Sequence, residues 1–98
     1  MPSTVRPTSA ASADLLAAHD WYELRSLGLG KDFVRMVDAA FASIGRRPEL
    51  FPPVHRGLRR VLLRRFPYAV FYGIDADAFR VVAVLHTAMD LRGLEDRT

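Results

Sequence analysis

A long run of strand-forming residues occupies the second half of the chain and reads LRRVLLRRFPYAVFYGIDADAFRVVAVLH from residue 58 to residue 86. Valine, phenylalanine and tyrosine are frequent in this run, and these residue types favour β-strands. Pro67 cannot donate a hydrogen bond to a ladder, so it marks a bend between two strands. Asp75-Ala76-Asp77 is typical of a hairpin turn. The run therefore predicts three strands, at about Leu58–Phe66, Tyr68–Ile74 and Phe79–His86.

Two of these strands carry apolar side chains on both faces. Tyr68–Ile74 and residues 81–85 show no regular alternation of polar and apolar positions. Because successive residues of a strand point to opposite faces, both faces of these strands need cover. Two helices can cover one face. We expect the other face to be covered either by the C-terminal tail or by a partner protein.

Two helices are predicted before the strands. An apolar stripe predicts a helix from about Ala10 to Leu27, with Thr8 or Ser9 as its N-cap. A second apolar face predicts a helix from about Lys31 to Ile44. The Gly28-Leu29-Gly30 turn between them is short. A short turn makes the two helices antiparallel neighbours, so they form a helical hairpin.

The remaining segments complete the predicted fold. Residues 46–57 contain three prolines and are expected to form a loop. Residues 1–7 form either an edge strand or a loose tail, and residues 91–98 form a polar tail with one short helical turn at most. The fold class is α+β, in the order (β)ααβββ: the helical hairpin packs on a mostly antiparallel sheet of three to four strands. Residues 1–98 are expected to form one domain.

Arginine is concentrated in one part of the chain. The chain has 14 basic and 11 acidic residues, for a formal net charge of +3. Residues 46–65 contain seven arginines and a single acidic residue, Glu49. Such a cluster suits a polyanion or an acidic partner. The alternative is a solvated strand face with occasional ion pairs.

The composition also excludes several kinds of protein. Cysteine is absent, which excludes a disulfide framework and a thiolate metal site. The three histidines lack the spacing of metal ligands, so a metal site is not expected. No cofactor is expected either. Residues 1–13 lack the apolar core of a signal peptide. No apolar run reaches the ~20 residues of a membrane span, and we expect a cytoplasmic protein without membrane contact.

Five segments along the chain form a recognisable series. They are ADLLAAHDWYE (residues 13–23), GLGKDF (28–33), PELFPPV (48–54), RRFPYAVFY (64–72) and VVAVLH (81–86) with Asp90 after it. In this order they resemble the first helix, the helical turn, the loop, the strand pair and the last strand of the RelE/ParE toxin superfamily. The resemblance is strongest to the ParE-like branch and extends from about residue 5 to residue 97.

The resemblance implies the toxin component of a type II toxin–antitoxin system, of the kind that inhibits growth and stabilises plasmids. Such a toxin is held in a hetero-oligomer by a small antitoxin that wraps around it. The resemblance also implies a first strand within residues 1–7. The antitoxin is expected to bury Tyr68, Phe71 and Tyr72 and to pair with the arginine cluster.

The superfamily has two known targets. ParE-like members poison DNA gyrase and cut nothing themselves, whereas RelE-like members cut mRNA in the ribosomal A site. Attack of a 2′-OH on the adjacent phosphate needs a base, an acid and cations near the phosphate. For RelE-like activity the predicted catalytic residues are His86, Arg65 and Tyr72. The predicted contacts to the target or to phosphate are Arg59, Arg60, Arg64 and Arg65.

The end of the last strand favours the ParE-like alternative. RelE-like nucleases usually carry an aromatic residue there, but Thr87-Ala88 follows His86 in this chain. His86 and Asp90 instead match a His-x-x-x-Asp ending of the ParE-like branch, in which the histidine is not known to be catalytic. His86 is therefore either an acid–base group or a structural group bonded to Asp90 or to a backbone carbonyl. Three hypotheses remain: a gyrase inhibitor, an mRNA endonuclease, and an inactive module that only binds its partner.

Overall fold

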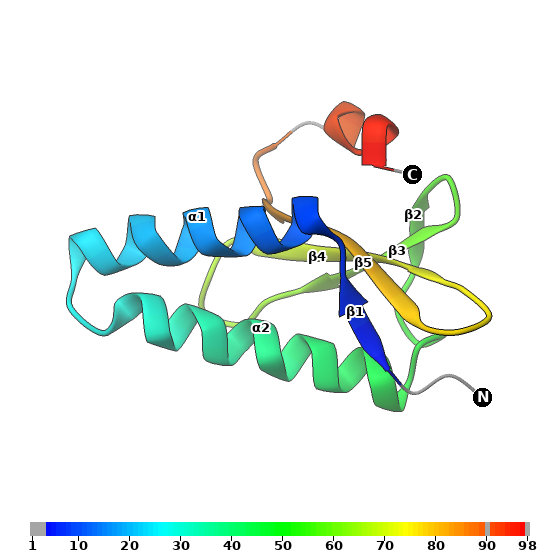
Figure 1. The fold of residues 1–98 in the computed structure, drawn as a ribbon, viewed down its shortest axis with the longest axis horizontal. Helices are drawn as coiled ribbons and strands as arrows, with labels where there is room; N and C mark the ends of the chain where they lie inside the picture. The colour runs from blue at the N-terminus through cyan, green and yellow to red at the C-terminus, as the bar shows by residue number, and fades with distance from the viewer. Residues whose placement is uncertain (1–3, 90, 98) are drawn as a thin grey trace.

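The computed structural model describes residues 4–89 and 91–97. A helical hairpin lies against one face of a five-stranded sheet, and a short C-terminal helix lies on the other side of the strands (Figure 1). The elements are β1 (Val5–Pro7), α1 (Ser9–Arg25), α2 (Leu29–Arg46), β2 (Pro53–His55), β3 (Leu58–Leu62), β4 (Tyr68–Ile74), β5 (Phe79–His86) and the 3-10 helix η1 (Leu91–Arg97). The predicted α+β class and helical hairpin are confirmed.

The sheet has five strands in the order β1-β5-β4-β3-β2, instead of the three to four predicted. β1 is the first strand that the superfamily resemblance implied, and it pairs in parallel with β5. The other neighbours are antiparallel, as predicted.

The fifth strand, β2, lies in a segment that the prolines had marked as a loop. Pro53 is the first residue of an edge strand, where its missing N–H costs no ladder bond. Arg56 and Gly57 both have positive φ, at 47° and 78°, and they form the two-residue turn that pairs His55 with Leu58. A left-handed arginine is not apparent from the sequence. The expectation of a continuous loop over residues 46–57 is therefore wrong.

The helix ends follow from local hydrogen bonds. The hydroxyl of Thr8 accepts from the Ala11 amide at 3.1 Å, so the predicted N-cap of α1 is confirmed. Gly28 lies in the left-handed region with φ 88° and precedes α2. The Glu23 carboxylate accepts from the amides of Gly28 and Gly30, at 2.9 and 3.0 Å. These bonds hold the pKa of Glu23 below its ordinary value and fix the turn of the hairpin.

The main core lies between the helical hairpin and the sheet. Aromatic rings fill the part of it beneath the tip of the hairpin, where Tyr22 stacks on Phe33 and meets the edge of Phe66. Tyr68 also packs against Phe33, with ring centroids 5.0 Å apart. Bulky aliphatic side chains fill the rest, and those of Val37, Ile44, Val70 and Val81 are fully buried.

The second face of the sheet is covered by the chain's own C-terminus. Leu94 on η1 is fully buried and packs with Phe71, Val82 and Ala83. The tail was expected to be polar, with one short helical turn; in the structure it forms the seven-residue 3-10 helix η1. Leu91 also packs against this cluster, and the two leucines hold η1 on a strand face that is apolar. The sequence left open whether the C-terminal tail or a partner protein covers this face. In the structure, the tail covers it.

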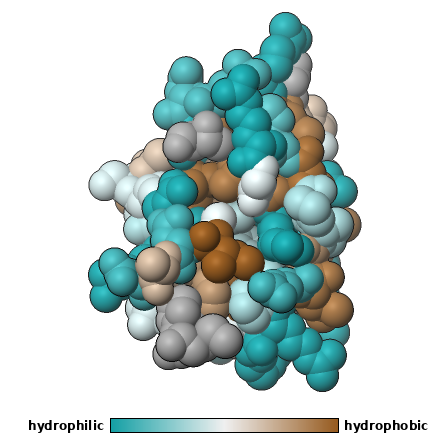
Figure 2. All heavy atoms as spheres, turned by 90° about the vertical axis from the view of Figure 1, so that its right-hand side faces the viewer, coloured by the Kyte–Doolittle hydropathy of each residue, from teal (hydrophilic) through white to brown (hydrophobic). Residues whose placement is uncertain are grey.

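The surface at the end of the sheet that carries the β4–β5 turn has a group of hydrophobic residues near its centre, with hydrophilic residues around it (Figure 2). Leu50 and Ile74 are exposed and line a hollow of about 440 Å³. None of the residues predicted for a functional site lines this hollow. Within the described residues, no helix has the length and apolar character needed to cross a membrane.

Candidate functional site

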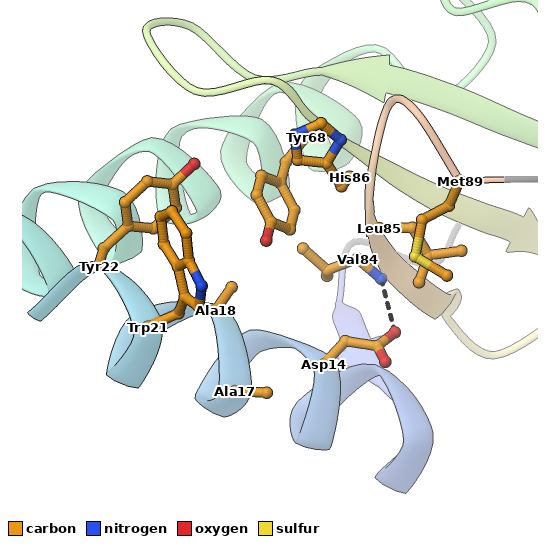
Figure 3. Close-up of a pocket in the computed structure, with 10 residues that line it drawn as sticks. All are labelled: Asp14, Ala17, Ala18, Trp21, Tyr22, Tyr68, Val84, Leu85, His86 and Met89. Atoms are coloured by element: carbon orange, nitrogen blue, oxygen red, sulfur yellow. Dashed lines mark hydrogen bonds between the residues drawn. The ribbon is translucent and has the colours of Figure 1, made fainter. Parts of the chain in front are cut away.

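An open pocket of about 470 Å³ lies between α1 and the end of β5. Trp21 and Tyr22 from α1 line one side of it, and Tyr68, His86 and Met89 line the other (Figure 3). Tyr68 and His86 are paired across β4 and β5, which places both predicted residues in the same pocket. Hereafter this is the aromatic pocket.

The walls of the aromatic pocket are mostly aromatic and apolar, with Asp14 as the one acidic residue that lines it. The rings of Tyr68 and His86 meet edge to face with centroids 5.3 Å apart, and Tyr22 approaches Tyr68 at 6.0 Å. Burial is the main reason that the pKa values of Tyr22 and Tyr68 are raised, so both hydroxyls stay protonated at neutral pH. Trp21 is 49% exposed, and the Arg25 guanidinium lies 3.3 Å from the centre of its ring. Such a surface suits apolar contacts with a ligand.

His86 is held by a local hydrogen bond. Its Nδ1 accepts from the backbone amide of Ala88 at 3.0 Å, so in the neutral ring the hydrogen is on Nε2. The expected partners were a backbone carbonyl and Asp90. The observed partner is a backbone amide, and Asp90 lies outside the described residues. A catalytic role of His86 stays a prediction.

The structure does not bring the three predicted catalytic residues together. Tyr72 is fully buried, and its hydroxyl donates to the Pro48 carbonyl at 2.6 Å. Burial also raises the pKa of this hydroxyl. Tyr72 pairs with Val81, which is about 16 Å along β5 from His86. Arg65 follows β3 and forms a 3.6 Å ion pair with Asp32 on α2.

The predicted antitoxin contacts are also separated. Phe71 is 3% exposed beneath η1, and Tyr72 lies in the main core on the opposite face of the sheet. Only Tyr68 of these three residues lines a surface pocket. Strand alternation already places Phe71 on the opposite face from Tyr68 and Tyr72. It could not show that only Tyr68 reaches a surface pocket, because all three belong to an apolar strand that is covered on both sides.

The predicted arginine contacts fall into two groups. Arg59 is structural, because its guanidinium donates to the backbone carbonyls of Glu49 at 3.2 Å and Phe51 at 2.6 Å. Arg64 is exposed and lines a second hollow, of about 450 Å³, between α2 and β3. Arg60 is partly exposed on β3. The hollow that Arg64 lines is hereafter the α2–β3 groove. It is also lined by Met36, Ala39, Ser43, Arg46, Phe51 and Leu63.

Sequence reasoning did not place Arg46 or Trp21 in a site. A signal for Trp21 was available, because Leu16, Trp21 and Leu24 add apolar side chains to α1 beyond its main stripe. Apolar residues outside the core-facing stripe suggest a second contact surface, and in the structure Leu16 is 59% and Leu24 is 86% exposed. Within residues 4–89 and 91–97, no group of histidine and acidic side chains is arranged to hold a metal ion.

Comparison with known proteins identifies the family. A family model described as "ParE toxin of type II toxin-antitoxin system, parDE" matches residues 5–91. The chain belongs to the ParE toxin family. The resemblance to the RelE/ParE superfamily, and to its ParE-like branch, is thereby confirmed. Membership also makes an antitoxin the expected partner of this ParE-family chain.

Structural comparison agrees with the family model. The chain is similar to a solved structure titled "Chromosomal ParDE TA system from P. aeruginosa", with 18% sequence identity and a TM-score of 0.73. The match covers 85% of this chain and 94% of that one. At this identity the likeness shows the ParE fold alone. None of the curated proteins compared with the chain is a significant match.

Proposed function

We propose that this ParE-family toxin inhibits growth by binding DNA gyrase and that it uses the aromatic pocket as a contact surface. The observation that carries the proposal is the separation of the residues needed for RNA cleavage. Tyr72 is sealed in the core with its hydroxyl on Pro48, away from His86. The pocket that contains His86 is suited to binding rather than to acid–base chemistry.

The chemistry of the pocket supports a protein target. Its walls combine aromatic rings with the side chains of Leu85 and Met89, and Met89 is 55% exposed. Its one acidic residue, Asp14, is already bonded to Arg97 and to the Val84 amide. Apolar pockets with an aromatic anchor at the rim are where protein interfaces concentrate their binding energy. An apolar side chain of gyrase is the occupant that fits best.

A supercoiling assay tests this proposal. Purified toxin should inhibit gyrase, and Trp21→Ala should raise the concentration for half-inhibition about tenfold, because an exposed tryptophan at an interface contributes strongly. Leu50→Ala is the matched control, because Leu50 is an exposed apolar residue outside the aromatic pocket. Full supercoiling activity at saturating wild-type toxin would contradict the proposal.

The same variants separate the two other hypotheses. If the chain is a ribosome-dependent mRNA endonuclease, His86→Ala and Arg65→Ala should abolish mRNA cleavage in a translating extract. Cleavage by the wild type and its loss in both variants would replace gyrase with the ribosome and mRNA as the target. Harmless overproduction of the chain without its antitoxin would favour an inactive binding module.

A further inference from the structure

The side-chain polar groups that are left free around the aromatic pocket can all donate a hydrogen bond. Among the residues that the structure describes, neither the indole N–H of Trp21 nor the Nε2–H of His86 has a hydrogen-bond partner. These two groups lie on opposite sides of the pocket (Figure 3). The one carboxylate that lines the pocket belongs to Asp14, and both of its oxygens already accept hydrogen bonds. A bound segment therefore has to supply the acceptors.

Arg25 extends this donor character to the rim of the pocket. It is the last residue of α1 and is exposed. Its guanidinium lies 3.3 Å from the centre of the Trp21 ring and donates one hydrogen bond, of 3.3 Å, to the Trp21 carbonyl. A guanidinium has five N–H donors, and within residues 4–89 and 91–97 no carboxylate pairs with this one. An uncompensated cation beside the pocket wall favours an anionic group on the ligand.

The same contact fixes the indole ring of Trp21. Arg25 covers one face of the ring, and the ring of Tyr22 meets it at 85° with centroids 5.0 Å apart. A half-exposed side chain without such neighbours samples several rotamers, and its immobilisation on binding weakens the affinity. Arg25 and Tyr22 therefore hold Trp21 in place before a ligand arrives.

We propose that Arg25 determines the specificity of the aromatic pocket. It positions Trp21 for contact and pairs with a carboxylate of the target, so the target segment carries an acidic side chain beside the apolar side chain that enters the pocket. A purely apolar segment would bury the free donors of Arg25 and Trp21 without partners, and a basic segment would be repelled by Arg25. The proposal rests on the proposed function, because it places this segment on the surface of gyrase.

The first test examines the indole in the free protein. Trp21 is the only tryptophan of the chain, so its fluorescence reports on this ring alone. Arg25→Ala should raise the rate of quenching by acrylamide about twofold, because the guanidinium no longer covers one ring face. The fluorescence anisotropy should fall as the ring gains freedom. Arg35→Ala is the matched control, because Arg35 is an exposed arginine on α2 outside the pocket.

The second test measures inhibition of gyrase supercoiling by variants of graded charge. Arg25→Gln should raise the toxin concentration for half-inhibition about tenfold, because it removes one partner of a charge pair. Arg25→Glu should raise it further, since a carboxylate would then face a carboxylate. Arg25→Lys should lie between the wild type and Arg25→Gln, because lysine keeps the charge but can neither stack as a plane nor bind a carboxylate with two parallel bonds. Arg35→Gln should behave as the wild type.

The salt dependence of inhibition separates the carboxylate pair from stacking alone. Half-inhibition by the wild type should require more toxin as NaCl is added, and Arg25→Gln should show a weaker dependence, because salt screens the pair that this variant lacks. Growth inhibition in cells repeats the comparison without assuming the target. Unchanged thermal unfolding of each variant shows that a loss of inhibition does not come from misfolding.

Four results would overturn the proposal. The first is inhibition by Arg25→Glu equal to that by Arg25→Gln, because no carboxylate would then face the residue. The second is wild-type inhibition by both variants, and the third is unchanged quenching of Trp21 in Arg25→Ala. The fourth is an Arg25→Glu variant that still inhibits growth and escapes the antitoxin, because the pocket would then bind the antitoxin. If the wild type inhibits growth and leaves gyrase active, the proposed function fails, and growth inhibition by the variants still judges Arg25.

Discussion

Tyr72 shows how one buried hydroxyl changes the interpretation of a residue. In the sequence it is a tyrosine beside an arginine cluster, and that setting suggests RNA chemistry. In the structure its ring is fully buried, and its hydroxyl bonds the carbonyl of Pro48, which lies before the proline-rich turn to β2. A buried hydroxyl needs such a partner, because an unbonded one would lose hydration without compensation. The residue therefore ties the loop after α2 to the sheet.

Tyr72→Phe separates this structural role from a catalytic one. The variant leaves the Pro48 carbonyl without its donor, so the free energy of unfolding in urea should fall by about 1–2 kcal/mol. Growth inhibition at a temperature where the variant is folded should equal that of the wild type. A folded Tyr72→Phe protein that no longer inhibits growth would show that the hydroxyl acts on a substrate.

η1 covers the second face of the sheet, which points away from the helical hairpin. Apart from buried Leu94, it is attached through Arg97 to Asp14 and through Glu95 to Arg56 at 3.7 Å. The Glu95–Arg56 pair is largely exposed and contributes little on its own. Leu94, with Leu91 packed beside it, is therefore the apolar anchor of η1, and the Arg97–Asp14 pair is its polar one. Without η1, Phe71 and Val82 would face solvent.

Leu94→Ala should loosen η1 as a unit. Truncation of a fully buried leucine costs about 2–5 kcal/mol, measured as the free energy of unfolding. The variant should also bind more of a dye specific for exposed apolar surface, because the cover over Phe71 is weakened. Leu62→Ala is the comparison, because Leu62 is exposed and should change neither measurement. Equal stability of Leu94→Ala and the wild type would mean that η1 does not anchor the second core.

The elements differ in how far local sequence predicts them. The helical hairpin is predictable because the Thr8 cap, the Gly28 turn and the apolar stripe are all local signals. β2 is not, because it depends on a positive φ at Arg56. η1 is not, because the two leucines of a polar tail have meaning only once a distant strand face is known.

The candidate sites depend even more on distant contacts. Tyr68 and His86 share a pocket because of the β4–β5 register, and the apolar pattern of both strands was visible in the sequence. Arg46 and Arg64 share a groove only because α2 crosses near β3. Composition identified the arginine cluster but could not show which of its arginines are structural and which are exposed. The structure assigns Arg59 to backbone carbonyls and leaves Arg64 exposed.

The Asp14 carboxylate connects three parts of the fold. Asp14 on α1 accepts from the Val84 amide on β5 at 3.0 Å and pairs with Arg97 at the end of η1. Arg97 also donates to the carbonyl of Val82 at 3.4 Å. The side chains of Asp14 and Arg97 are largely buried, with 15% and 26% of their surface exposed, respectively. This cluster links the hairpin, the sheet and the C-terminus.

Asp14→Asn tests this link. Loss of the charge leaves a largely buried guanidinium without its counter-ion, and the free energy of unfolding should fall by about 2–3 kcal/mol. Asp20→Asn is the matched control, because Asp20 is an exposed aspartate on the same helix. The expected control change is within about 0.5 kcal/mol. An equal effect of the two substitutions would remove Asp14 from this role.

Because the partner of Asp14 lies 83 positions away, α1 cannot reach its final bonding state until nearly all of the polypeptide has been synthesised. β1 likewise needs β5, which is made after every other strand. A shortened translation product would expose a bare apolar sheet and a lone carboxylate, the kind of surface that cellular proteases recognise. An incomplete chain of this protein is therefore expected to be degraded before it can fold.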